Sequence, residues 1–167
     1  MFTGQYRHQV DSKNRVFVPQ KLRKIDNNKS YDHFILLLGP TGSLILTTQD
    51  RFEQYEQECT PFPNDPEKRR EYKRYYLSAN LEVVLDNQGR ILIPPGYLES
   101  AGIKKEGEVI FVGMGNWIEI WDAETFELRK QKLNLDWNEM ANEFLDALER
   151  VGKNNKPVEP PIQTSGD

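Results

Sequence analysis

The sequence predicts an α+β fold in which two tandem repeats each contribute short strands and helices. The stretch VDSKNRVFVP, residues 10–19, returns as LDNQGRILIP, residues 85–94, with its Asp, Arg and Pro in register. Each copy is followed by an apolar segment interrupted by glycine, at residues 34–52 and 109–126. A unit of about 50 residues buries too small a fraction of its surface to fold alone. The two repeats are therefore expected to share a core, with each other or with another chain.

Each repeat is expected to begin with a strand, a polar turn and a second short strand. Residues 16–18 and 91–93 are apolar runs bounded by turn-forming residues, which is typical of strands. Asn14 and Gly89 occupy the same place in the two turns, and both residue types readily adopt a positive φ. The two turns are therefore predicted to have the same backbone conformation.

A short helix is expected after each of these second strands. Pro19 and Pro94 end the strands and suit the first turn of a helix, where no amide donor is needed. Gly102 follows the second of these helices as a C-terminal stop. The side chains expected on the buried sides are Leu22 and Ile25 in the first repeat and Tyr97, Leu98 and Ala101 in the second.

A hairpin and a further helix complete each repeat. The sequences GPTG and GMGN, residues 39–42 and 113–116, place glycine between two apolar runs, which predicts a hairpin. Thr47 or Thr48 in the first repeat, and Asp122 in the second, are the expected N-caps of the helices that follow. Each repeat is thus predicted to run strand, turn, strand, helix, strand, turn, strand, helix.

Two further segments lie outside the repeats. Three prolines within residues 61–66 mark a connector, and residues 67–77 have helical character. Apolar residues recur at helical spacing from Leu133 to Val151, which predicts an amphipathic helix. The predicted divisions are a first repeat with its following helix (1–60), a connector and helix (61–80), a second repeat (81–133), a C-terminal amphipathic helix (134–151) and a disordered tail (152–167).

The composition is that of a water-soluble protein from a reducing compartment. Apolar residues make up 37% of the chain and charged residues 29%, and the mean hydropathy is −0.73. No run approaches the ~20 apolar residues that span a bilayer, and the N-terminus lacks the apolar segment of a secretory signal. The single cysteine, Cys59, excludes an internal disulfide and is expected to be a small core residue. We therefore expect a cytoplasmic protein with no membrane partner.

The net charge of −4 conceals an uneven distribution of charge along the chain. Residues 1–30 contain seven Lys or Arg against two Asp, a balance of +5, whereas residues 81–167 have a balance of −7. A local cluster of charge is what attracts a polyanion, because screening limits its reach to roughly 8–10 Å at cellular salt. A basic N-terminal face on an acidic body is compatible with DNA binding.

The repeated Asp–Arg turn allows two interpretations. An Asp that opens a turn accepts backbone N–H bonds and an adjacent Arg can pair with it, so the motif could serve only to set hairpin register. Alternatively, the planar fork of Arg reads guanine edges or clamps phosphates, and a two-stranded ribbon fits a major groove about 12 Å wide. The additional basic residues of the first copy favour DNA binding; they are Lys13 and Arg15 on the turn and Lys21, Arg23 and Lys24 on the following helix.

The tandem D-x-x-x-R motif, each time followed by apolar-x-apolar-Pro, resembles that of the MraZ family. The opening MF-x-G adds to the resemblance, which covers about residues 1–151. MraZ proteins are bacterial transcriptional regulators associated with the cluster of division and cell-wall genes, and they carry two SpoVT/AbrB-type swapped-hairpin units. The resemblance implies a pseudo-symmetric swapped-hairpin β-barrel built from the two repeats, with peripheral helices.

The resemblance also implies partners and a site. Subunits of the family assemble into ring-shaped homo-oligomers that contact short, G-rich direct repeats in promoter DNA through the D-x-x-x-R turns, in the cytoplasm at the nucleoid. Carried onto this chain, the DNA-binding candidates on the turns are Lys13, Asn14 and Arg15 in the first copy and Gln88, Gly89 and Arg90 in the second. Lys21, Arg23 and Lys24 would anchor phosphates, while Asp11 and Asp86 would brace the turns and orient the arginines.

Two departures from the family pattern suggest that the repeats divide the labour. Asn14 stands where Gly is usual, which is tolerable because Asn visits the left-handed region. Gln88 stands where Lys is expected, so the second turn carries one positive charge fewer. We expect the first turn to contact DNA and the second mainly to hold the barrel or the subunit contacts.

Other classes of function receive less support from the residues. His8 and His33 lie in unrelated contexts, and no P-loop, G-x-S-x-G or metal-ligand cluster is present in the sequence. We therefore expect no enzyme activity, no cofactor, no metal and no small-molecule substrate. The alternative is an antitoxin-like or other partner-binding module of the same fold. The aromatic residues of the connector, Tyr72, Tyr75 and Tyr76, and those of the C-terminal helix would then bind another protein, or else cover the barrel or a neighbouring subunit.

Overall fold

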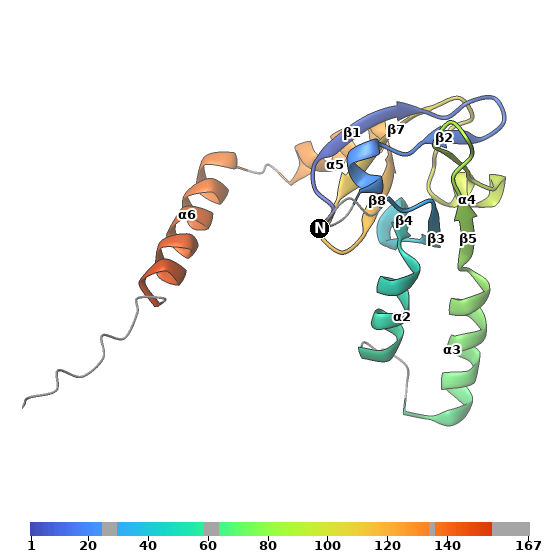
Figure 1. The fold of residues 1–167 in the computed structure, drawn as a ribbon, viewed down its shortest axis with the longest axis horizontal. Coiled ribbons are helices and arrows are strands. Elements are labelled where there is room, and N and C mark those ends of the chain that lie inside the picture. The colour runs from blue at the N-terminus through green and yellow to red at the C-terminus, as the bar shows by residue number, and fades with distance from the viewer. Residues whose placement is uncertain (25–29, 59–63, 134–135, 155–167) are drawn as a thin grey trace, which may run out of the picture. The chain divides into compact units, whose positions relative to one another are not determined.

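The computed structural model describes residues 1–24, 30–58, 64–133 and 136–154, and these fall into two units (Figure 1). Met1–Leu128 form a compact unit that contains both repeats as far as the first part of their last helix, and Arg129–Asp167 form a second unit that is described by itself. The predicted α+β class is confirmed, because the first unit combines an antiparallel sheet with several helices. Cys59 and residues 155–167 of the predicted tail lie outside the described residues, as does Ile25.

The two repeats contain the same elements in the predicted order. The first comprises β1 (Gln5–Gln9), β2 (Arg15–Phe17), α1 (Gln20–Arg23), β3 (His33–Leu38), the 3-10 turn η1 (Pro40–Gly42), β4 (Ser43–Thr47) and α2 (Gln49–Glu58). The second comprises β5 (Leu81–Val84), β6 (Arg90–Leu92), α4 (Pro95–Ser100), β7 (Glu108–Gly113), β8 (Ile118–Asp122) and α5 (Ala123–Lys132). Between them lies α3 (Pro66–Ser78), and α6 (Trp137–Asn154) follows the second repeat.

The strands of the two repeats are exchanged within one antiparallel sheet. Its order is β1-β7-β8-β4-β3-β5, so the first strand of each repeat pairs with the third strand of the other. The middle strands β4 and β8 join the two hairpins across the centre. The remaining strands, β2 and β6, pair with each other as a separate two-stranded ribbon. Every strand of the second repeat except β7 and β8 therefore depends entirely on the first repeat for its partner.

The hydrophobic core is built from equivalent positions of the two repeats. The short strands β2 and β6 bury only their central residue, whereas β3, β4, β7 and β8 contain consecutive buried residues. Equivalent positions that are both fully buried include Val16 with Ile91, Val18 with Ile93, Leu44 with Ile118 and Leu46 with Ile120. Of the helix residues predicted to be buried, Leu22, Leu98 and Ala101 are buried and Tyr97 is half-buried. Neither repeat contains a separate core in the described residues.

The two predicted helix caps have different outcomes. Asp122 Oδ1 accepts the backbone N–H of Thr125 at 2.9 Å at the start of α5, which confirms the predicted cap. The predicted threonine cap of α2 is wrong. The Thr47 hydroxyl donates to the Asn116 carbonyl at 3.4 Å, and the Thr48 hydroxyl is buried with no partner among the described residues. The neighbouring hairpin therefore binds the Thr47 hydroxyl, and the Thr48 hydroxyl forms no side-chain cap.

Expression of residues 1–65 alone is expected to give an unfolded chain. In the full protein β1 pairs with β7 and β2 pairs with β6, so the fragment loses the partners of two of its four strands. Circular dichroism during heating should show no cooperative transition for the fragment, in contrast to the full chain. A stable monomer with a sharp transition would contradict the shared core.

Candidate nucleic-acid interface

The β2–β6 ribbon brings the two Asp–Arg turns side by side, although they lie 75 residues apart in the sequence. Phe17 faces Arg90 and Arg15 faces Leu92 in the register of the ribbon. The connection continues into the turns, because the Val18 N–H donates to the Gly89 carbonyl at 3.0 Å. Side chains alternate along a strand, so the buried Val16 and Ile91 face the core. Both arginines lie on the opposite, outer face.

The first turn is organised around the carboxylate of Asp11. Its Oδ1 accepts the backbone N–H groups of Lys13 at 2.9 Å and Arg15 at 2.8 Å. Its Oδ2 accepts Nε of Arg15 at 2.8 Å and lies 2.7 Å from Nη2 of the same guanidinium. Asn14 closes the turn with φ of +60°, a conformation that Asn tolerates better than most residues. Asp11 therefore holds both the backbone of the turn and the side chain of Arg15.

The second turn reproduces this geometry. Asp86 Oδ1 accepts the backbone N–H groups of Gln88 at 2.9 Å and Arg90 at 3.0 Å, and Oδ2 accepts Arg90 Nε at 2.8 Å. Gly89 takes the place of Asn14, with φ of +77°. The equivalence of the two turns that the sequence predicts thus extends to their side-chain hydrogen bonds.

The two arginines differ in what remains available for a ligand. Each guanidinium uses its Nε–Nη2 edge for its own Asp, which leaves the Nη1–Nη2 end of the fork. Nη1 of Arg90 lies 3.7 Å from Oδ2 of Asp11, so this end is drawn toward the first turn. Nη1 of Arg15 has no partner among the described residues. Bidentate recognition of a guanine edge or a phosphate needs a free fork, and Arg15 provides the better one.

Arg23 lies against the second turn, although it belongs to the first repeat. Its guanidinium carbon lies 5.0 Å from the centre of the Phe17 ring. A Cβ added at Gly89 would come within 2.9 Å of that carbon, which shows how closely Arg23 approaches the turn, and the φ of +77° favours glycine there. The equivalent helix of the second repeat, α4, has the sequence PGYLES and contains no basic residue. Arg23 of the first repeat therefore places a positive charge beside the second turn, where Gln88 stands in place of a lysine.

The remaining candidates lie on the surface around the ribbon. Lys13 and Gln88 are exposed at the tips of the two turns. Lys21 is exposed on α1, and Lys24 is exposed directly after the end of that helix. The structure therefore gathers the predicted residues of both turns on the ribbon, while only Arg23 of the α1 group has a defined contact with a turn.

The pKa values of Asp11 and Asp86 are lowered from the ordinary value of 3.8 to about 2. The largest cause is the side-chain hydrogen bond from the neighbouring arginine, followed by the backbone N–H of the same residue. Both effects favour the charged carboxylate. Between pH of about 2 and 3.8, the two carboxyl groups consequently bind fewer protons in the folded state than in the unfolded state.

Acidification should weaken both turns as the pH falls from about 4 to about 2. The stabilisation is fully present above the unfolded pKa of 3.8 and is lost as the pH falls through the folded pKa of about 2. Denaturant unfolding measured across this range should show a steeper fall in stability for the native chain than for a variant with Asp11→Asn and Asp86→Asn. Identical pH profiles would show that the carboxylates do not brace the turns.

Neither histidine belongs to a metal-binding group among the described residues. His8 is half-buried, with the rings of Phe17 and Phe111 at 5.3 and 6.0 Å, and burial lowers its pKa. His33 is exposed beside Glu82 at 3.1 Å. No group of three or more His, Cys, Asp or Glu side chains within the described ranges is arranged to hold a metal ion. Among the helices of these same ranges, none is both long enough and apolar enough to cross a membrane.

Comparison with known proteins gives one consistent result. A family described as "MraZ protein, putative antitoxin-like" matches residues 1–75 and 77–147. A protein of Mycoplasmoides gallisepticum named transcriptional regulator MraZ is 36% identical over 147 residues, which cover 87% of this chain and 99% of that protein. Proteins of the same name from Caldanaerobacter subterraneus and Thermoanaerobacter pseudethanolicus are 35% and 34% identical, over 87% and 89% of this chain and 97% and 99% of their own lengths.

Proposed function

Because this chain belongs to the MraZ family, we propose that it is a sequence-specific DNA-binding transcriptional regulator. The family matches both repeats. The similar proteins are named transcriptional regulators, and the similarity covers nearly their whole length. The resemblance read from the tandem motif is thereby confirmed. The same names agree with the prediction that the chain is not an enzyme.

The observation that carries the proposal is the pair of braced arginines on the outer face of the ribbon. Asp11 fixes the orientation of Arg15 with two contacts of 2.7–2.8 Å and leaves the end of its fork available. A preoriented guanidinium loses less conformational entropy when it binds a base edge or a phosphate. Lys13 and Asn14 at the same turn, and Gln88, Gly89 and Arg90 at the second, complete the proposed contact surface. Lys21, Arg23 and Lys24 are assigned to the phosphates on either side.

The proposed architecture is a swapped-hairpin barrel that displays both turns along one edge. The exchange of β1 and β5 between the hairpins of the two repeats supports it. The β2–β6 ribbon would close this barrel at the side of the turns. In this arrangement each subunit presents one pair of turns to DNA.

The proposed assembly is a ring-shaped homo-oligomer that binds direct repeats in a promoter of division and cell-wall genes. A head-to-tail contact that closes on itself forms a ring and presents the same turns at regular intervals. Several weak contacts on repeated sites then combine through their high effective concentration. The protein would act in the cytoplasm, at the nucleoid.

Binding to a protein partner is the second candidate function, because the description of the matching family includes the word antitoxin-like. An antitoxin-like module would be a dimer that buries part of its surface against a toxin. Light scattering distinguishes the two assemblies by mass, since a ring contains more subunits than a dimer. A dimeric mass together with no affinity for DNA would favour this alternative.

Selection of bound fragments from random duplex DNA tests the proposed function directly. We expect enrichment of short sites that recur in the same orientation, with affinity that falls as salt rises because phosphate contacts release counterions. The natural control is the same chain with both Arg15→Ala and Arg90→Ala. If the native chain enriches no sequence beyond this variant, the proposal is wrong.

A further inference from the structure

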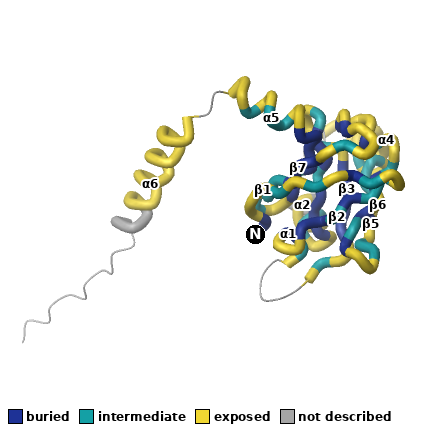
Figure 2. The backbone as a smooth tube through the Cα atoms, turned by 90° about the horizontal axis from the view of Figure 1, so that it is seen from above, coloured by how far each residue is buried: buried dark blue, intermediate teal, exposed yellow. Residues whose placement is uncertain are grey.

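Helix α6 is exposed along its described length (Figure 2), and its apolar residues recur at helical spacing as a stripe. The stripe consists of Trp137, Met140, Phe144, Leu145 and Leu148, which are 62%, 44%, 63%, 56% and 52% exposed. Within its own unit, Nζ of Lys130 lies 5.9 Å from the centre of the Trp137 ring. The charges of the helix are mainly acidic, with four Asp or Glu against two Lys or Arg.

An isolated helix with such a stripe lacks most of its stabilisation. Asp136 caps its N-terminus by accepting the N–H groups of Asn138 at 2.8 Å and Glu139 at 3.2 Å. A cap contributes only about 1 kcal/mol, whereas most of the stability of a helix in a protein comes from packing of its apolar face. Exposed apolar stripes rimmed by charge mark interaction surfaces. The stripe of α6 therefore calls for a partner with a basic rim.

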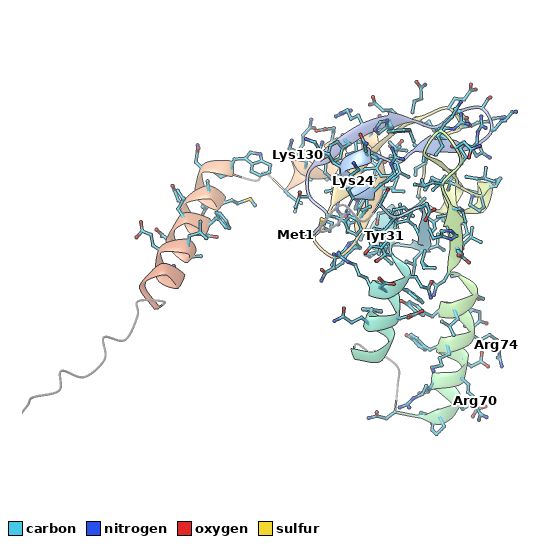
Figure 3. The ribbon with its side chains drawn as sticks, viewed as in Figure 1. Met1, Lys24, Tyr31, Arg70, Arg74 and Lys130 are labelled. Carbon is cyan, nitrogen blue, oxygen red and sulfur yellow. The ribbon has the colours of Figure 1, made fainter. Side chains whose placement is uncertain are left out.

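Helix α3 has the complementary properties. It carries five Lys or Arg against two Glu, and its described side chains are exposed except for the half-buried Tyr76. Tyr76 stacks on Phe52 of α2 with ring centres 6.3 Å apart, which identifies the side of α3 that faces α2. Figure 3 shows Arg70 and Arg74 on the opposite side. Leu77, three residues after Arg74, is 44% exposed on the same face.

The basic side of α3 is separated from the Asp–Arg turns. Helix α3 leads directly into β5, and the second turn begins only at the far end of that strand. Figure 1 shows α2 and α3 projecting from one end of β5 while the ribbon lies at the other. A duplex bound to the turns therefore does not account for the charge of α3.

We propose that α6 of one copy docks on α3 of a neighbouring copy, with its apolar stripe against Leu77 and the carbon stems of Arg70 and Arg74. This inference rests on the homo-oligomer that forms part of the proposed function. The acidic residues beside the stripe, Glu143 and Glu149, would face Arg70 and Arg74. Pairing of two α6 helices would instead bring together surfaces of the same sign, which is unfavourable. Each copy has one α6 and one α3, so the contact repeats head to tail and can close into a ring.

Charge reversal in the full chain tests the contact. One variant carries Arg70→Glu and Arg74→Glu, and a second carries Glu143→Lys and Glu149→Lys. Light scattering should show that each variant alone assembles less well, with a rise of at least about tenfold in its dissociation constant. An equimolar mixture should recover the native mass, because alternating the two variants around a ring makes every contact complementary again. Circular dichroism checks that each variant is folded.

The matched control reverses two exposed lysines outside α3, Lys104→Glu and Lys105→Glu, and should retain the native mass. The inference is overturned if both variants keep that mass, or if the mixture fails to recover it. It is equally overturned if the α3 variant stays assembled and instead loses DNA affinity with a smaller salt slope, since α3 would then contact phosphates. A monomeric native chain would refute both this contact and the proposed ring. If the native chain forms a ring that binds DNA and both charge-reversal variants keep the native mass, only the proposed contact is refuted.

Discussion

Replacing Arg15 with alanine is expected to abolish sequence-specific DNA binding while the protein stays folded and assembled. The free end of the Arg15 guanidinium is the best-placed fork on the ribbon, because Asp11 holds only its Nε–Nη2 edge. The turn itself does not require this side chain. Oδ1 of Asp11 still accepts the backbone N–H groups of residues 13 and 15 after the substitution.

The expected loss is large because it is repeated in every subunit. A bidentate base contact contributes about 1–3 kcal/mol, which corresponds to roughly five- to 150-fold in affinity at one site. When several subunits bind neighbouring sites, the losses multiply. Fluorescence anisotropy with the selected sequence and with a scrambled duplex should therefore show that the preference for the selected sequence disappears.

Two further variants separate a role in DNA binding from a role in structure. Arg90→Ala should be milder, because Nη1 of Arg90 is already drawn to within 3.7 Å of Asp11. Arg7→Ala is the matched control, since Arg7 lies on β1 outside the ribbon and pairs with Glu108 at 2.8 Å. If Arg15→Ala unfolds the chain, or if Arg15→Ala and Arg90→Ala both leave DNA affinity unchanged, the turns serve only to hold the hairpins.

Replacing Leu46 with alanine should destabilise both repeats together, by about 2–5 kcal/mol in the free energy of unfolding. Leu46 is fully buried on β4 and lies opposite Ile118 of β8, in the centre of the sheet. The cavity would therefore open between the two hairpins. Loss of packing at this point removes contacts from the second repeat as well as from the first.

Denaturant unfolding gives the size of this effect, and amide hydrogen exchange shows how far it extends. Protection should fall in β7 and β8 as much as in β3 and β4, with one transition for the whole unit. Leu38→Ala is the matched control, because Leu38 lies on β3 but is 46% exposed and should cost far less. Loss of protection confined to the first repeat would mean that the repeats have independent cores.

The sequence by itself determined the elements and the chemistry of the turns, since both depend on neighbours along the chain. Alternating apolar residues, Pro19 and Pro94 after the strands, and Asn14 or Gly89 at a positive φ specify local conformation without a distant partner. The Asp–Arg brace also spans only four residues. The N-cap of α5 was predictable on the same grounds, because Asp122 lies three residues from the donor that it binds.

Only the tertiary structure decided which strands pair and which basic side chains lie beside each turn. The repeat pattern is satisfied equally well whether each first strand pairs within its own repeat or crosses to the other. The crossing of β1 to β7 is a contact between residues about 100 positions apart that local preferences do not encode. For the same reason the sequence placed Arg23 with the first turn, whereas pairing of β2 with β6 carries it to Gly89 of the second. Residues distant in sequence share a charge environment only after the strands between them have paired.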